Sequence, residues 1–175
     1  LFYLFTFLPL KIPEISCRYE NTYISLRRLE NEALRILSHG QISFGDADWN
    51  PIQVSIGQFY GIEINDFAVT VAKTALWIAI VLMHLDFLPL KTNAHIVEGN
   101  ALRIDWESVV PKHNLSYIMG NPPFVGASMM TKQQKEQAVS IYGKIKLSNS
   151  IDYVGAWYHK AAAYIDGTTI RVSFV

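Results

Sequence analysis

Short apolar runs alternate with helix-like segments along this chain, and the alternation restricts it to a layered α/β fold. The runs that read as strands cover residues 58–64, 95–98, 115–119 and 170–175. The segments that read as helices cover residues 21–38, 66–83, 131–142 and 151–165. Strands that alternate with helices form a mainly parallel sheet with helices packed on it. The 175 residues are enough for one such domain with its own core.

Charge and cysteine content narrow the classes of partner and compartment. Fifteen basic and fifteen acidic residues cancel, and the sequence pI is near 7.1. Affinity for nucleic acid comes mostly from Lys and Arg on phosphates, so a DNA substrate would need most of its contacts from outside this chain. The single cysteine, Cys17, excludes an internal disulfide framework and fits a reducing compartment. We therefore predict a cytoplasmic protein.

Two apolar stretches do not read as membrane spans. Residues 1–10 have about half the ~20 residues that a spanning helix needs, and they lack the basic region and cleavage site of a signal peptide. Residues 67–85 are longer, but Thr70, Lys73 and Thr74 interrupt them. We predict no membrane span, and a helix buried against the sheet instead.

Two of the strand-like runs end in polar groups, which a parallel sheet would bring to one edge. Glu63 ends the run at residues 58–64, where an acid commonly accepts both hydroxyls of a ribose; a carboxylate that caps the helix starting at Asp66 is an equal alternative. Asn100 follows the run at residues 95–98. Its side-chain oxygen could accept from an adenine amino group, and the Ala101 N–H could donate to a ring nitrogen. Spacing alone favours an ordinary turn at Asn100.

The tetrapeptide Asn121-Pro122-Pro123-Phe124 follows the run at residues 115–119. It places an amide, a carbonyl without a competing N–H and a flat ring at the carboxyl end of a strand, where open α/β sheets bind ligands. These groups suit a planar exocyclic amine, because two oxygens can accept its two hydrogens while the ring stacks on the base. A plain proline-rich turn would not explain an aromatic residue directly after two prolines.

Taken in order, residues 60–65 (YGIEIN), 97–102 (VEGNAL) and 118–124 (IMGNPPF) resemble the class I S-adenosylmethionine-dependent DNA methyltransferases of the N6-adenine type. Residues 23–30 and 66–73 are similar to one subgroup. These are large bacterial restriction-modification and defence enzymes, in which methyltransferase, target-recognition and sometimes nuclease modules share a chain.

The resemblance implies a Rossmann-like α/β fold whose mainly parallel sheet is incomplete. Residues 21–175 would form a partial methyltransferase catalytic domain, and residues 1–20 stay an unassigned apolar segment. The chain starts without Met and stops inside its last strand, so we expect a fragment. Five histidines show no pair at metal-ligand spacing, and we predict no metal site.

By position, the resemblance also implies a cofactor site. Glu63 would hold the ribose of the methyl donor, S-adenosylmethionine, and Ile64 would pack on the donor's adenine. Asn100 stands where many relatives have Asp, and with Ala101 it would recognise the adenine amino group.

For the target base, the resemblance implies an adenine flipped out of duplex DNA. The Asn121 side chain and the Pro122 carbonyl would accept hydrogen bonds from its N6 amine, and Phe124 would stack on it. Two acceptors favour a pyramidal nitrogen, whose freed lone pair can attack the sulfonium methyl group in line. Carbon-5 cytosine methylation needs a cysteine nucleophile after the first proline, and here Pro123 occupies that place.

The chain departs from the family at one point. Relatives carry a glycine-rich motif before the first helix, where the backbone approaches the methionine part of the donor. This chain has no glycine before Gly40, so we expect it to bind the donor poorly. The alternatives are a methyltransferase for another planar amine, such as a protein glutamine or an RNA base, and a catalytically inactive methyltransferase-fold fragment.

Overall fold

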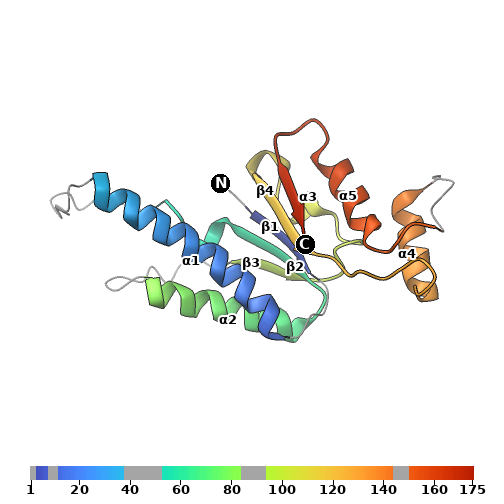
Figure 1. The fold of residues 1–175 in the computed structure, drawn as a ribbon, viewed down its shortest axis with the longest axis horizontal. Helices are drawn as coiled ribbons and strands as arrows, with labels where there is room; N and C mark the ends of the chain where they lie inside the picture. The colour runs from blue at the N-terminus through green and yellow to red at the C-terminus, as the bar shows by residue number, and fades with distance from the viewer. Residues whose placement is uncertain (1–2, 8–11, 38–52, 84–93, 144–149) are drawn as a thin grey trace.

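A computed structural model describes residues 3–7, 12–37, 53–83, 94–143 and 150–175. The strands form one parallel sheet in the order β3-β2-β1-β4-β5 (Figure 1). Their bounds are Tyr3–Phe7 (β1), Phe59–Glu63 (β2), His95–Glu98 (β3), Tyr117–Asn121 (β4) and Arg171–Phe174 (β5). The predicted α/β fold with a mainly parallel sheet is confirmed. This strand order belongs to doubly wound folds, which bind ligands where the order reverses, here between β1 and β4.

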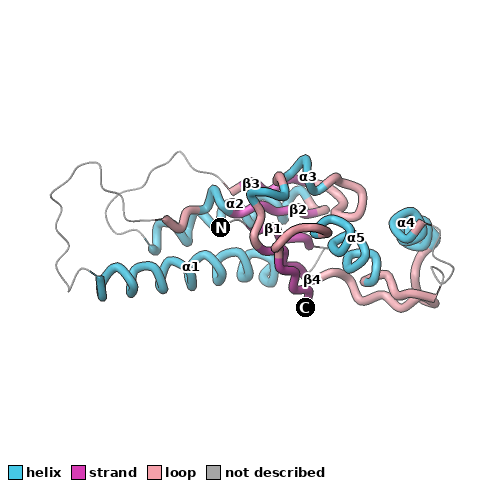
Figure 2. Tube along the Cα trace, turned by 90° about the horizontal axis from the view of Figure 1, so that it is seen from above, coloured by secondary structure: helices cyan, strands magenta, loops and turns pink. Residues whose placement is uncertain are grey.

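Helices pack on both faces of the sheet. Their bounds are Ile12–Leu37 (α1), Asp66–Met83 (α2), Trp106–Val109 (α3), Lys132–Tyr142 (α4) and Gly155–Ile165 (α5), with short 3₁₀ turns at Ile56–Gln58 (η1) and Lys112–Asn114 (η2). Figures 1 and 2 show α1 lying beside α2, with α4 farther from the sheet than α5. Among the described helices none has the length and apolar character to cross a bilayer.

The helix α2 forms because its buried side chains recur at helical spacing. The buried set is Ala68, Val69, Ala72, Ala75, Leu76, Ala79 and Ile80. All of them except Ala75 pack in one cluster with Phe59 of β2 and Ile96 of β3. Six of the seven are small or β-branched, which lets the helix lie close to the sheet. The side chain of Asn65 caps the helix by accepting from the Ala68 N–H at 3.2 Å.

Alternation along the strands builds a second core on the opposite face. In β2, Phe59 faces α2, whereas Ile62, three residues later, joins Trp106 of α3 and Tyr164 of α5. In β4, Ile118 belongs to the same core. A third core packs α4 against α5. The sheet is therefore covered on both sides, as parallel sheets require.

Three boundaries differ from those predicted. The first helix begins at Ile12 rather than at residue 21; Pro13 lies in its first turn, where a missing N–H costs nothing. The helix predicted over residues 151–165 begins only at Gly155, because turn hydrogen bonds to Asp152 and Tyr153 precede it. The strand predicted over residues 115–119 runs from Tyr117 to Asn121.

The strand β1 and the short helix α3 were not predicted. The backbone of residues 3–7 pairs in parallel with both β2 and β4, so the apolar segment left unassigned contributes the central strand.

Two Arg–Glu pairs on α1 have the same spacing but opposite environments. Arg27 is 2% exposed and its guanidinium bonds the Glu30 carboxylate. Glu30 also accepts from the backbone N–H groups of Gln53 at 2.5 Å and Val54 at 3.1 Å, which joins α1 to the segment that enters β2. The Arg35–Glu32 pair, at 2.7 Å, is exposed.

We predict that Glu30→Ala lowers the free energy of unfolding by about 3–5 kcal/mol, because it leaves the Arg27 charge buried without a carboxylate to neutralise it. The matched control Glu32→Ala removes a solvated pair and should leave the unfolding midpoint unchanged within error. Urea denaturation of both variants tests this, and equal losses would contradict it.

Candidate functional site

The three predicted polar strand ends lie at the same edge of the sheet. Asn121, the last residue of β4, pairs in register with Phe7 of β1. Glu63, the last residue of β2, pairs with Glu98 of β3. Because β1 lies between β2 and β4, the strands that carry Glu63 and Asn121 are about 10 Å apart, at ~4.8 Å per neighbour.

Glu63 is a buried carboxylate with one unsatisfied oxygen. The residue is 1% exposed, and its Oε1 accepts from the Asn65 N–H at 3.0 Å. Its Oε2 has no hydrogen-bond partner among the described residues. Burial raises the pKa of Glu63, while hydrogen bonds from the backbone of Asn65 and Ile64 oppose the shift. A buried oxygen without a donor is costly, so a hydroxyl reaching Oε2 would relieve that cost once the groups covering it move aside.

The Glu63 carboxylate bonds the N–H of Asn65, the residue before α2, and does not cap the first turn of the helix. Asn65 caps α2 through the Ala68 N–H, and the Asp66 carboxylate accepts from the Phe67 N–H at 2.6 Å. The Glu63 carboxylate therefore lies just before the helix and leaves its first turn to other side chains.

The loop after β3 is tied to the end of β2. The Gly99 N–H donates to the Glu63 carbonyl at 2.7 Å. Gly99 has a φ of 154°, a backbone conformation that side-chain-bearing residues rarely adopt, so a substitution there would be strained. The Asn100 Oδ1 accepts from the Leu102 N–H at 2.9 Å, which forms the turn that spacing favoured. An amide oxygen has a second lone pair, so Asn100 can still accept from a ligand.

A lysine that sequence reasoning missed holds this loop from α5. The Lys160 ammonium donates to the carbonyls of Ala101 at 2.7 Å, Leu102 at 3.0 Å and Ile104 at 2.5 Å. The indole N–H of Trp106 also donates to the Ala101 carbonyl, at 2.9 Å. The sequence contains a signal for it: the lysine falls at helical spacing among the buried side chains Ala156, Trp157, Ala161 and Tyr164.

The Asn-Pro-Pro-Phe motif leaves β4 with its ring in solvent. Asn121 is half-buried, Pro122 is buried and Pro123 is half-buried, whereas Phe124 is 72% exposed. Such a ring contributes little to the core and presents its face for stacking.

The segment after the motif is anchored to the turn before α5. The Tyr153 N–H donates to the Val125 carbonyl at 2.9 Å, and the Ala127 N–H donates to Asp152 Oδ1 at 2.8 Å. The path of the chain beyond Phe124 is therefore set by residues 25 or more positions later.

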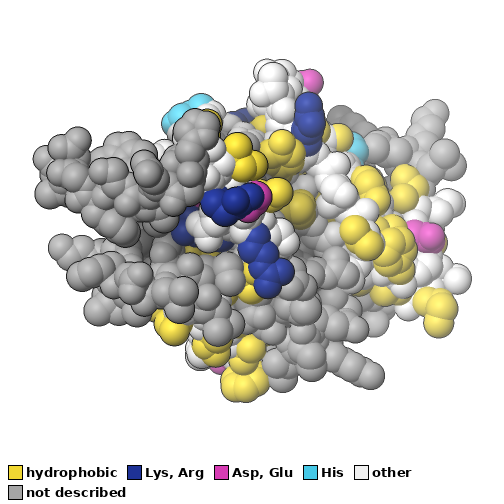
Figure 3. All heavy atoms as spheres, turned by 60° about the vertical axis from the view of Figure 1, so that its left-hand side comes forward, with side chains coloured by type: hydrophobic (Ala, Val, Ile, Leu, Met, Phe, Trp, Pro, Cys, Tyr) yellow, Lys and Arg dark blue, Asp and Glu magenta, His cyan; other side chains and the backbone are white. Residues whose placement is uncertain are grey.

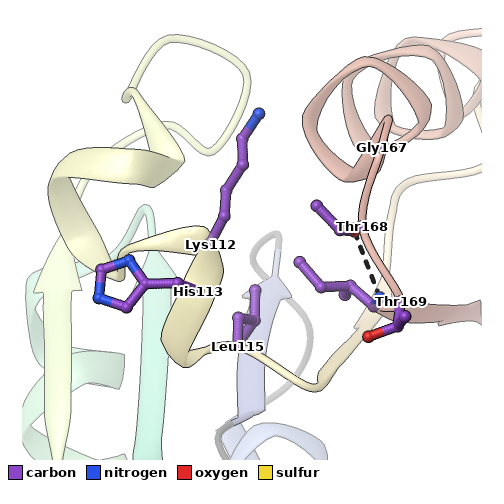
Figure 4. A pocket seen from close by; sticks show the side chains of 7 residues that line it. Lys112, His113, Leu115, Gly167, Thr168 and Thr169 are labelled. Carbon is purple, nitrogen blue, oxygen red and sulfur yellow. Dashed lines mark hydrogen bonds between the residues drawn. The ribbon is translucent and has the colours of Figure 1, made fainter.

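A cavity of about 420 Å³ lies elsewhere, between η2 and the segment that enters β5 (Figure 4). Its lining residues are Lys112, His113, Leu115, Gly167, Thr168, Thr169 and Ile170. Leu115 precedes β4 and Ile170 precedes β5, so the cavity is at the amino ends of the strands, opposite the candidate site. No cluster of His, Cys, Asp or Glu in the described ranges could hold a metal ion.

Surface charge agrees with the neutral composition. On the face shown in Figure 3, a few Lys and Arg side chains lie among hydrophobic, acidic and uncharged ones.

Comparisons with known proteins connect this geometry to a family. Residues 20–175 match the family described as MmeI, DNA-methyltransferase domain. DNA methyltransferase A of Bacillus subtilis (strain 168) is 38% identical over 167 residues, which cover 88% of this chain and 18% of the relative. The solved structure of the type IIL restriction-modification enzyme MmeI in complex with DNA has a TM-score of 0.81 and 38% identity, over 98% of this chain and 24% of that chain. The chain thus spans about a fifth of the curated relative, 18% of its length, and it belongs to the MmeI DNA-methyltransferase domain family.

Proposed function

We propose that this chain carries the catalytic core of a DNA adenine-N6 methyltransferase of the restriction-modification type, using S-adenosylmethionine. The observation that carries the proposal is the position of the Asn-Pro-Pro-Phe motif: it follows the carboxyl end of β4, where the strand order reverses between β1 and β4, and Phe124 is exposed and could receive a base. Membership of a DNA-methyltransferase family favours DNA over a protein glutamine or RNA as the acceptor.

In the acceptor half, the protein positions an amine rather than forming a covalent bond. The Asn121 Oδ1 and the Pro122 carbonyl would accept from the two N6 hydrogens of a flipped adenine, and Pro123 fixes the backbone between them and Phe124. Drawing on both hydrogens weakens the conjugation of the nitrogen lone pair with the ring, so the amine becomes a better nucleophile. Stacking on Phe124 holds the base in the orientation for attack.

In the donor half, the described residues fit a nucleoside. The unsatisfied Glu63 Oε2 matches a ribose hydroxyl, and Ile64, at 38% exposed, offers an apolar surface for the adenine. Asn100 and the Ala101 N–H would read the edge of the adenine. When bound, S-adenosylmethionine supplies an electrophilic methyl group.

The rival reading, an inactive member of the family, rests on the chain between β1 and α1. Residues 8–11 (LPLK) contain no glycine and lie outside the described residues. A loop without glycine restricts close approach of the backbone to the donor's methionine part. We therefore keep the expectation of weak donor binding, with most DNA contacts supplied from outside this chain.

We predict that Asn121→Ala lowers N6-methyladenine by about a hundredfold or more in the DNA of cells expressing the gene that encodes this chain, because a positioned polar group at the reacting atom is lost. The control Asn114→Ala changes an exposed asparagine at the other edge of the sheet and should leave methylation intact. Undiminished methylation with Asn121→Ala would refute its role, and no methylation with the unaltered chain would favour the inactive reading.

We predict that Phe124→Ala changes the free energy of unfolding by less than about 0.5 kcal/mol, because the ring is already exposed. The same change should weaken binding of an oligonucleotide with one unpaired adenine by about 5- to 150-fold, from ~1–3 kcal/mol of lost stacking. Fluorescence anisotropy measures this. An oligonucleotide with an abasic site in place of that adenine is the control, and equal weakening of both would contradict stacking.

We predict that Glu63→Gln stabilises the fold but weakens donor binding. Burial raises the pKa of Glu63, so its contribution to stability is full below its unfolded value of 4.5 and is lost as pH rises through the raised value. The neutral amide avoids that loss, so the variant's advantage in unfolding free energy should grow from about pH 4 to 7. Denaturation at several pH values and donor titration test this. Glu98→Gln, at an exposed position, should show no such gain.

A further inference from the structure

Lys160 is a half-buried charged side chain that the proposed chemistry does not use. It lies on the face of α5 that packs against the sheet, and its Nζ is 5.3 Å from the centre of the Trp106 ring. Desolvating an ammonium is costly, and nothing in the packing of α5 requires a cation at this position. The groups that accept hydrogen bonds from the ammonium therefore indicate which part of the structure Lys160 holds.

All three hydrogens of the ammonium have acceptors, and all three acceptors belong to one loop. They are the carbonyls of Ala101, Leu102 and Ile104. A compact ammonium can satisfy three converging carbonyls, whereas the planar fork of an arginine cannot. The site is specific for lysine, and it restrains the backbone on both sides of Leu102.

The restrained loop is the one that carries Asn100 and Ala101. Its first residue is bound to the Glu63 carbonyl through the Gly99 N–H, so its start is fixed by β2 and its end by Lys160. A loop held at both ends keeps the Asn100 amide and the Ala101 N–H in one orientation, which recognition of a ligand requires.

We propose that Lys160 is a positioning residue of the donor site, which fixes the loop over residues 99–104 so that it can recognise the adenine of the methyl donor. The inference rests on the proposed function, because it takes this loop to be part of the donor site. Lys160 itself does not touch the donor; it acts through Ala101 and its neighbours.

The same helix also connects the two halves of the site. The turn that leads into α5 holds the segment after Phe124, through Asp152 and Tyr153, while Lys160 holds the donor loop. A rigid α5 therefore keeps a constant separation between the loop for the target base and the loop for the donor (Figure 1).

The hold of Lys160 on the loop over residues 99–104 should depend on pH. Burial lowers the pKa of Lys160 to about 8, and the Asp105 carboxylate opposes the shift. Asp105 is the N-cap residue of α3, directly after the loop. The nearby titratable groups of α5 have other partners: His159 contacts the Tyr142 ring, and the Tyr164 hydroxyl donates to the Val110 carbonyl. Above pH 8 a neutral amine has two hydrogens for three carbonyls, so the loop should loosen.

The first test measures amide hydrogen exchange by NMR on the 175-residue chain. Lys160→Met should speed exchange of the Leu102, Arg103 and Ile104 amides by about tenfold or more, with no change at Ile62 and Ile118 in the sheet. Lys160→Arg should give an intermediate effect. Lys73→Met, which changes an exposed lysine of α2, should have none. If the loop amides are unchanged in Lys160→Met, the hold of Lys160 on the loop is refuted whatever the chain binds.

The second test uses adenosine as the probe, because it carries the ribose and adenine without the methionine part that the missing glycines would bind. Lys160→Met should raise the adenosine Kd by about tenfold or more. The wild-type Kd should also rise between pH 7 and 9, and that of Lys160→Met should not.

The outcomes separate this inference from the function on which it rests. If Lys160→Met speeds amide exchange in the loop but leaves the adenosine Kd unchanged, the positioning role is overturned. A wild-type chain that does not bind adenosine would refute the donor site itself, while the exchange data would still decide whether Lys160 holds the loop. Should Lys160→Met fail to fold, Trp106→Phe removes a single donor to Ala101 and should show the same changes at smaller size.

Discussion

The arrangement of the site depends on the backbone pairing of β1 with β2 on one side and β4 on the other. Without that pairing the sheet would separate into two pairs of strands, β3-β2 and β4-β5, and an isolated pair of strands is marginally stable. The register of β1 sets Phe7 beside Asn121 and Thr6 beside Ile62, so it fixes how far Asn121 lies from Glu63. The separation of these two strand ends is thus a property of one five-residue strand.

Charged side chains join helices to loops at the ends of this sheet. Arg27 and Glu30 join α1 to the segment entering β2, and Lys160 joins α5 to the loop leaving β3. In both places backbone groups of a loop bond the charged side chain: N–H groups bond Glu30, and carbonyls bond Lys160. These bonds offset the cost of removing the charge from water only when the loop holds one conformation. Glu63 differs, because one of its oxygens is left without a partner. Among the described residues, the Nε of Arg27 is the other buried side-chain atom without a hydrogen-bond partner, although its guanidinium is paired with Glu30.

Sequence patterns anticipated the parts of the fold that repeat or end sharply. The alanine-rich periodicity predicted α2, and the apolar runs at residues 58–64, 95–98 and 115–119 predicted β2, β3 and β4, the last of them two residues too early. The pattern could not reveal β1, since a short apolar segment is compatible with a strand, a helix end or a leader, and only tertiary pairing decides. Lys160 was missed for a related reason: a lysine is normally exposed, and its carbonyl partners are distant in sequence. The sequence pattern correctly placed the candidate residues at one edge of the sheet. Their chemical roles cannot be assigned from the fold alone.

The family match begins at residue 20, whereas the structural likeness covers 98% of the chain and so takes in at least part of β1. Parallel strands recognise each other through main-chain N–H and C=O groups, which every residue except proline presents alike. Main-chain pairing alone can therefore hold residues 3–7 at the centre of the sheet, whatever apolar side chains they carry. The strand order at this point depends on the backbone more than on any sequence motif.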